Sequence, residues 1–192
     1  MAYYTAAELR EQAGGMTASA ARAELSHAAT TPSANYDIFL SHSIKDEVLV
    51  LGLRNALRNL GLTVYVDWLD DPALDRARVT PTTAVTLRQR MRSSRVMVYA
   101  TSSNAAASRW MPWELGYFDG RREQSKVAIC PITTGAGSIH GQEYLGIYKR
   151  VEPLEDNGIV FPYVLKPSGI EGESVRSFVH GEDEFRRVIR RD

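Results

Sequence analysis

Short apolar segments alternate with helical patterns from residue 36 onward, and this alternation limits the folds open to the chain. Residues 38–40 and 96–100 are brief apolar runs bounded by polar residues, which is typical of buried strands. Between them, residues 49–60 repeat apolar side chains on one helical face and end at Gly61. Short strands separated by helices form a parallel sheet that helices cover on both faces. The sequence therefore predicts an α/β protein.

The same reading extends over the rest of the chain. The predicted strands are 38–40, 62–66, 96–100, 127–132 and 144–151. The predicted helices are 49–60, 81–91 and 110–122, with a final short helix at Phe185, Val188 and Ile189. Residues 69–80 are predicted to form a long loop. Ligands bind beyond the carboxyl ends of the strands in such sheets. This rule selects four candidate segments: 41–43, 67–80, 101–110 and 133–142.

The first 35 residues differ from the body in composition. Residues 1–35 are rich in Ala, Thr and Ser and hold few large apolar side chains, so they cannot build a core alone. We expect an N-terminal helical and linker extension over 1–35 and one domain over 36–192, whose part after about residue 155 matches the pattern loosely. The extension is either a solvated segment or a docking or oligomerisation arm.

Composition excludes several classes of function. Lys and Arg number 23 and Asp and Glu number 23, so the formal net charge is 23 − 23 = 0. A nucleic-acid coat or a polybasic membrane anchor needs excess positive charge. Cys130 is the single cysteine, which excludes an internal disulfide, and no apolar run approaches the roughly 20 residues of a membrane span. We expect a cytoplasmic protein without nucleic-acid or membrane partners.

Familiar catalytic motifs are absent. The chain has no phosphate-binding loop of the P-loop type, no G-x-S-x-G and no H-E-x-x-H. Cys130 sits in an apolar run and is expected to be a packing residue. The histidines lack the spacing of metal ligands and lie at His27, His42, His140 and His180. We expect no bound metal.

Two groups of residues remain as site candidates. Ser41, His42 and Ser43 follow the first strand at the start of a helix, where amides and hydroxyls can face an anion or simply cap the helix. Trp110 and Glu114 are four residues apart on a predicted helix and therefore share one face. An aromatic wall beside a carboxylate offers a flat surface for a ring, but the same spacing also suits a core aromatic cluster with a surface glutamate.

These pieces together resemble a Toll/interleukin-1 receptor (TIR) domain. The segment YDIFLSHS at 36–43 resembles the opening strand motif of the family, and VYVD at 64–67 leads into a loop that resembles its BB loop. Residues 96–103 and 108–115 follow in the family's order, and Trp110 with Glu114 matches the W-x-x-x-E of members that consume NAD. The resemblance covers residues 36–150 well.

The resemblance implies a flavodoxin-like fold with a five-stranded parallel sheet and helices on both faces. It implies cleavage of the bond between nicotinamide and ribose in NAD⁺, with NAD⁺ as substrate and no separate cofactor. Glu114 is then catalytic, and the implied substrate-binding residues are Ser41, His42, Ser43, Asp67, Trp68 and Trp110. Family members associate through TIR–TIR contacts, so a homo-oligomer is expected, together with a separate effector protein that senses the product in anti-phage defence.

The chemistry suits a single carboxylate. Nicotinamide leaves as a neutral ring, and the transition state resembles an oxocarbenium ion, as in glycoside hydrolysis. Glu114 beside the ribose can stabilise that positive charge. Water as the acceptor gives ADP-ribose, the adenine ring or an adenine-linked group of the same molecule gives a cyclic ADP-ribose isomer, and a second base or amine gives an exchange product. The sequence leaves all three open. Two alternatives are a non-catalytic TIR interaction module and a nucleoside- or deoxyribose-transferring enzyme on a similar sheet.

Overall fold

A computed structural model describes most of the chain. The described residues are 3–17, 19–20, 35–71, 74, 78–122, 124–134, 142–156, 159–182 and 184–187. Of the residues singled out in the sequence, His27, His140, Val188 and Ile189 lie outside them.

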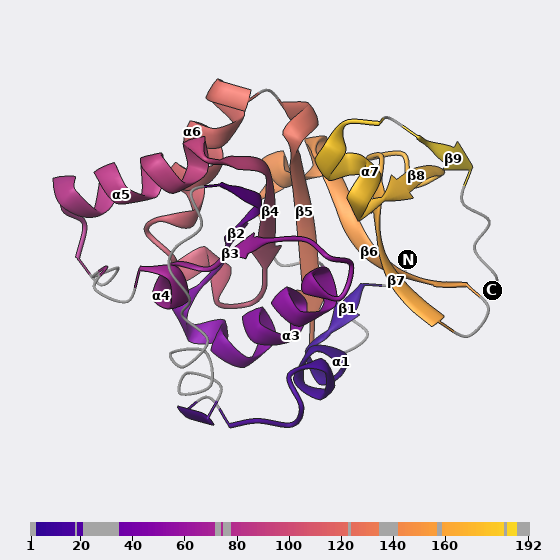
Figure 1. The fold of residues 1–192 in the computed structure, drawn as a ribbon, viewed down its shortest axis with the longest axis horizontal. Coiled ribbons are helices and arrows are strands. Elements are labelled where there is room, and N and C mark those ends of the chain that lie inside the picture. The colour runs from indigo at the N-terminus through magenta and orange to yellow at the C-terminus, as the bar shows by residue number, and fades with distance from the viewer. Residues whose placement is uncertain are drawn as a thin grey trace.

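Five parallel strands form the centre of the molecule (Figure 1). Their order in the sheet is β3-β2-β4-β5-β6, and each neighbouring pair is parallel. Their bounds are β2 Tyr36–Ser41, β3 Val64–Tyr65, β4 Ser94–Thr101, β5 Val127–Thr133 and β6 Lys149–Asp156. The prediction of an α/β fold with five parallel strands is confirmed.

The sheet is wider than predicted because the C-terminal part adds antiparallel strands. β6 pairs with β7 (Ile159–Leu165), β7 with β8 (Glu171–Ser174), and β8 with β9 (Arg186–Arg187). Pro153 and Pro162 lie opposite each other in the β6–β7 pair. Proline is depleted in strands, so these two residues argue against a β6–β7 hairpin in the sequence, and the hairpin was not predicted.

Three details of the predicted elements were wrong. The fifth strand begins at Lys149, later than predicted, because Glu143–Ile147 forms a short 3₁₀ helix, η4. The start of the predicted loop at residue 69 lies inside a helical turn, α4 (Asp67–Asp70). Phe185 lies outside any helix, and the last helix among the described residues is α7 (Val175–His180). Ser174 caps α7, and Gly181 ends it in the left-handed conformation with φ 72°.

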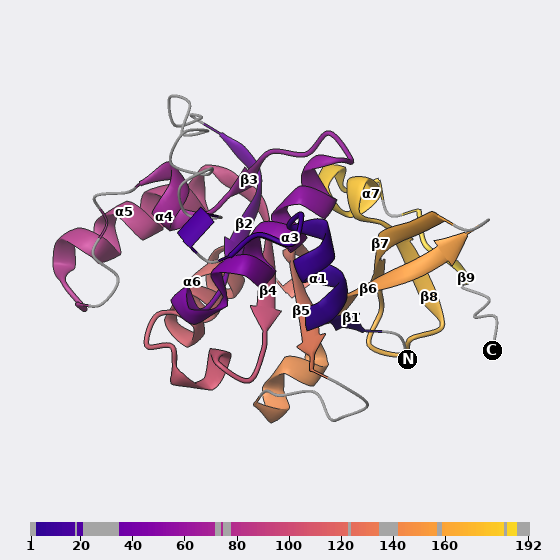
Figure 2. The same ribbon diagram turned by 90° about the horizontal axis from the view of Figure 1, so that it is seen from below.

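Helices cover both faces of the sheet, as Figures 1 and 2 show. One apolar core lies beneath α1 (Ala6–Gln12), α3 (Glu47–Arg58) and α7, and the other beneath α5 (Pro81–Arg92) and α6 (Met111–Arg122). Side chains of β4 alternate between them: Val98 enters the first core, whereas Met97 and Tyr99 enter the second. Cys130 is buried in the first core, and this burial raises the pKa of its thiol, which fits the predicted packing role.

The N-terminal segment packs on the body of the same chain (Figure 2). β1 (Tyr4–Thr5) adds to the carboxyl end of β5, where Tyr4 lies opposite Ile132. Thr5 and Glu8 form a capping box that starts α1. Leu9 is fully buried against α3, and its carbonyl oxygen lies so close to Gly52 that an added Cβ would stand 1.9 Å from it. Gly52 is therefore the residue that lets α1 approach α3.

Candidate functional site

Glu114 lies in the first turn of α6 and is fully buried. Its Oε2 accepts a hydrogen bond from the Ser41 hydroxyl at 2.6 Å. Ser41 is the last residue of β2, and the alternation along that strand turns it toward α6. A hydroxyl donor stabilises the ionised carboxylate. The buried Glu114 carboxylate is thus oriented by the residue at the end of β2.

Trp110 fixes the start of α6. Its carbonyl oxygen accepts the backbone N–H of Glu114 at 2.8 Å, and its ring packs edge-to-face on Trp113 with centroids 5.4 Å apart. Trp110 is only 4% exposed and belongs to the core beneath α5 and α6. In this conformation the indole packs in the core beneath the helix that carries Glu114. Its ring is not exposed as a flat surface for a ligand.

Tyr99 is a neighbour of the site that sequence reasoning missed. It lies opposite Ser41 in the β2–β4 register and belongs to the core beneath α6. Burial is the main cause that raises its pKa, and the nearby Tyr144 and Glu114 raise it further. Tyr99 therefore stays neutral at ordinary pH. The signal that could have found it is the two-residue period of β4, which puts Tyr99 on the same face as Met97.

His42, Trp68 and Asp67 contact one another at the start of the loop that follows β3. The indole N–H of Trp68 donates to His42 Nε2 at 2.7 Å, so the ring proton sits on Nδ1, which lies 2.8 Å from the carbonyl oxygen of Leu40. Asp67 Oδ1 lies 3.2 Å from the same Nε2. The three side chains hold α4 against the end of β2.

Asp46 links the connections that follow β2 and β4. Its carboxylate accepts from the Ser102 hydroxyl at 2.5 Å and from the Asn104 side-chain amide at 2.7 Å. Ser43 caps the short 3₁₀ helix η1 (Ile44–Asp46) through the N–H of Lys45. Ser43 and Asp46 have the S-x-x-D spacing of a capping box, but only the Ser43 half is observed, because the Asp46 carboxylate binds the neighbouring connection.

All seven predicted site residues lie at the carboxyl edge of β2 and its neighbours. Five of them form two contacting groups. Glu114 joins Ser41, whereas His42 joins Asp67 and Trp68; Ser43 lies beside them on the chain and Trp110 starts α6. Except for the half-buried Trp68, these side chains are at most 4% exposed. Glu114 can meet a ribose only after the surrounding segments move, so the conformation is a closed one.

The turn after α4 is held by Asp71, whose carboxylate accepts two hydrogen bonds from the Arg90 guanidinium at 2.7 Å each and one from the Tyr65 hydroxyl at 2.9 Å. The Asp71 bond is the largest cause that raises the pKa of Arg90. This bidentate pair ties the turn to α5.

We expect Arg90→Ala to loosen this turn. Hydrogen bonds to charged groups contribute about 1.5–3 kcal/mol, so the loss of about 2 kcal/mol should lower the Tm by roughly 4–8 °C. Thermal unfolding measures the change, and limited proteolysis should show faster cleavage between α4 and α5. Arg95→Ala is the control because Arg95 is 61% exposed, and it should stay within about 0.5 kcal/mol of wild type. Equal effects of the two substitutions would contradict an anchoring role for Arg90.

No cluster of three or more His, Cys, Asp or Glu side chains that could hold a metal ion occurs in the described ranges. In the same part of the chain, no helix is both long and apolar enough to cross a membrane.

The fold and the site define an α/β domain in which the carboxylates of Glu114, Asp46 and Asp67 are buried at the carboxyl edge of a parallel sheet. Comparison with known families assigns the class: the family described as "TIR domain" matches residues 38–153. This chain belongs to the TIR domain family.

Two curated proteins are similar to this chain. A protein of Bacillus cereus (strain MSX-D12) named "Probable 3' cyclic ADP-D-ribose synthase ThsB'" is 44% identical over 151 residues, which cover 78% of this chain and 70% of that protein. A protein of Cytobacillus dafuensis named "Putative cyclic ADP-D-ribose synthase TIR2" is 34% identical over 96 residues, which cover 50% of this chain and 24% of that protein. The first similarity extends well beyond the W-x-x-x-E segment.

Proposed function

We propose that this protein is a TIR enzyme that consumes NAD⁺ and converts it to nicotinamide and a cyclic ADP-ribose in bacterial defence. The observation that carries the proposal is Glu114, a buried carboxylate oriented by Ser41 in a chain 44% identical to a protein named as a 3′ cyclic ADP-ribose synthase. NAD⁺ is the substrate, and the protein needs no further cofactor for this step.

The reaction breaks one bond and forms another. The bond between the nicotinamide nitrogen and ribose C1 breaks, and its electron pair leaves with the neutral nicotinamide. Glu114 stabilises the positive charge that develops on the ribose. A hydroxyl of the adenosine ribose in the same molecule then bonds to C1 and releases its proton. The cyclic product has the composition of ADP-ribose less one water molecule, so nothing else is consumed.

Exclusion of water favours ring closure over hydrolysis. Ser41, His42 and Glu114 are each at most 1% exposed, and a site that closes in this way around the substrate keeps water from the reactive ribose. Hydrolysis to ADP-ribose is the competing outcome when water enters. Association of several copies through TIR–TIR contacts is the means that we propose for opening the site, because Glu114 is inaccessible in the single closed chain. A separate effector protein would sense the product.

Mass spectrometry of the products tests the proposal. Concentrated protein incubated with NAD⁺ should release nicotinamide together with a product one water molecule lighter than ADP-ribose. ADP-ribose as the only companion product would replace the cyclase with a hydrolase. Absence of nicotinamide at every protein concentration, also with crowding agents, would favour a non-catalytic interaction module. Base exchange on nucleosides without use of NAD⁺ would point instead to a transferase.

A further inference from the structure

Tyr99 is a buried side chain near Glu114 whose hydroxyl is unused within the protein. It is the residue of β4 that lies opposite Ser41, and the Ser41 hydroxyl donates to Glu114. All three side chains lie on the face of the sheet that α6 covers. The Tyr99 side chain is 4% exposed, yet its hydroxyl makes no hydrogen bond to any residue that the structure describes. An unpaired donor therefore lies at the candidate catalytic site.

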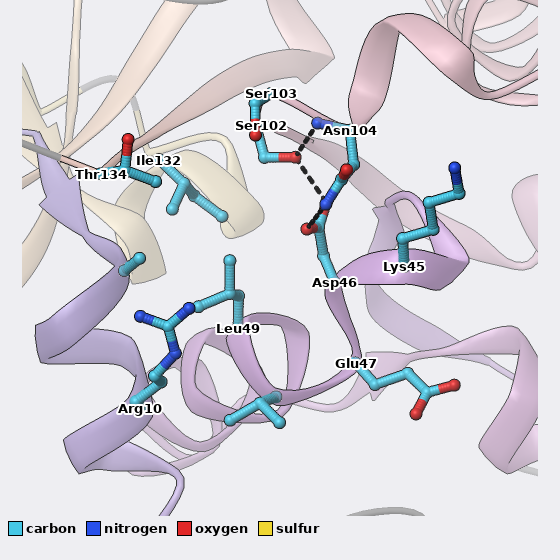
Figure 3. Close-up of a pocket in the computed structure, with 12 residues that line it drawn as sticks. Arg10, Lys45, Asp46, Glu47, Leu49, Ser102, Ser103, Asn104, Ile132 and Thr134 are labelled. Atoms are coloured by element: carbon cyan, nitrogen blue, oxygen red, sulfur yellow. Dashed lines mark hydrogen bonds between the residues drawn. The ribbon is translucent and has the colours of Figure 1, made fainter. Parts of the chain in front are cut away.

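Two other buried hydroxyls at this edge of the sheet have partners. Ser41 donates to Glu114, and Ser102, which lines a cavity beside α1 and α3, donates to Asp46 (Figure 3). Most buried polar groups in proteins are hydrogen-bonded, and an unpaired one costs free energy until a water molecule or a ligand completes it. The unpaired hydroxyl of Tyr99 therefore indicates a group that binds there.

The protonation state of Tyr99 determines what it can bind. Burial is the main cause that raises its pKa, and the neighbouring Tyr144 and Glu114 raise it further, so the hydroxyl keeps its proton and can donate it. Glu114 is near enough to affect Tyr99 but accepts no hydrogen bond from it. The other neighbour, Tyr144, is 42% exposed. Tyr99 thus neighbours both the buried carboxylate and a side chain that solvent reaches.

The chemistry of Tyr99 and Glu114 selects a ligand hydroxyl. An ionised carboxylate only accepts hydrogen bonds, whereas a neutral phenol has one proton to donate. A ligand hydroxyl can accept from the phenol and donate to the carboxylate at the same time, which neither a carbonyl oxygen nor an ammonium group can do. In NAD⁺ the sugar at the bond that breaks is a ribose with two neighbouring hydroxyls.

We propose that Tyr99 is a substrate-binding residue whose hydroxyl, in the open site, donates to a hydroxyl of the nicotinamide ribose while the ribose donates to Glu114. The inference rests on the proposed function, because it takes NAD⁺ as the ligand. The contact holds the ribose against the carboxylate, next to the carbon on which positive charge develops. It adds to the site a residue of β4 that carries no short sequence motif.

Tyr99→Phe tests the contact because it removes only the oxygen atom. We expect kcat/KM for NAD⁺ to fall about 5- to 10-fold, the size expected for one neutral hydrogen bond. The Tm should stay within about 2 °C of wild type, because the hydroxyl has no partner among the described residues. Nicotinamide release and thermal unfolding measure the two quantities under the conditions in which wild type is active.

Tyr148→Phe is the matched control and should show the opposite behaviour. Tyr148 is also a buried tyrosine of the core beneath α5 and α6, but its hydroxyl donates to Asp119 at 3.0 Å. Its substitution should lower the Tm by roughly 2–4 °C and change kcat/KM by less than about twofold. A loss of activity equal to that of Tyr99→Phe would assign both effects to packing and overturn the contact.

Two analogues of NAD⁺ identify the bonded group, because one lacks the 2′-hydroxyl and the other the 3′-hydroxyl of the nicotinamide ribose. The effect of Tyr99→Phe should shrink to less than about twofold on at least one analogue, since the partner of the hydroxyl is then already missing. Wild-type kcat/KM in Tyr99→Phe, or an undiminished loss on both analogues, would overturn the ribose contact. Absence of nicotinamide release by wild type would instead reject the proposed function, and the contact with it.

Discussion

Glu114→Gln should abolish nicotinamide release, with a loss of at least about 100-fold in kcat. The substitution keeps the shape of the side chain and still offers an oxygen to the Ser41 hydroxyl, but it removes the negative charge. Removal of one preorganised group that stabilises the charge of a transition state lowers kcat about 10²–10³-fold. Release of nicotinamide from NAD⁺ is the measurement, made under the same assembly conditions as for wild type.

Glu173→Gln is the matched control for this experiment. Glu173 is also a buried glutamate, 2% exposed, and accepts a hydrogen bond from Ser177 at 2.6 Å. It belongs to β8 in the C-terminal extension, away from α6. Its substitution removes a comparable buried charge yet should retain most activity after correction for the folded fraction. A folded Glu114→Gln protein with full activity would reject the catalytic assignment.

Gly52→Ala should destabilise the protein, unlike the same change at Gly116 or Gly120 in α6. The added Cβ would stand 1.9 Å from the backbone oxygen of Leu9, and backbone atoms cannot yield as a flexible side chain can. The expected loss is about 3 kcal/mol, from overpacking or from displacement of α1 and exposure of the buried Leu9. The Tm should fall by roughly 6–12 °C in thermal unfolding.

Gly120→Ala is the control for Gly52→Ala. Gly120 also lies inside a helix, α6, but an added Cβ there meets no atom within 4 Å. The change should stabilise the helix by roughly 0.5–1 kcal/mol, because alanine loses less backbone entropy than glycine. A Gly52→Ala protein as stable as Gly120→Ala would show that α1 does not pack on α3 in solution.

Glu114 is buried in this conformation, and His42, Asp67 and Trp68 contact one another at the end of β2. Under the proposed function, NAD⁺ reaches Glu114 only after side chains that cover it move.

Much of the site was predictable because it lies in consecutive or regularly spaced residues. Ser41, His42 and Ser43 follow one strand, and the spacing of Trp110 and Glu114 is that of one helical turn. Ligands bind beyond the carboxyl ends of the strands in such sheets, so both groups of residues are predicted at the same end of the sheet. The roles of Ser41 and Glu114 remain predictions, but the structure does bring the two side chains into contact.

The parts that could not be predicted depend on contacts between distant segments. Tyr99 lies beside the site because it pairs with Ser41 in the β2–β4 register. Asp46 accepts a hydrogen bond from Ser102, which is 56 residues away in the chain. The prolines of the β6–β7 hairpin carry no strand signal by themselves. They are tolerated because the two strands still pair along the rest of their length.

The sequence by itself determined the α/β class, the succession of strands and helices along the chain and the family, because each depends on local apolar periodicity and short motifs. Tertiary structure alone decided that the N-terminal segment packs on α3 through Gly52, that the sheet continues into an antiparallel extension, and that Glu114 is closed off from solvent. These features arise from close approach and burial between segments far apart in the chain, which local periodicity does not record.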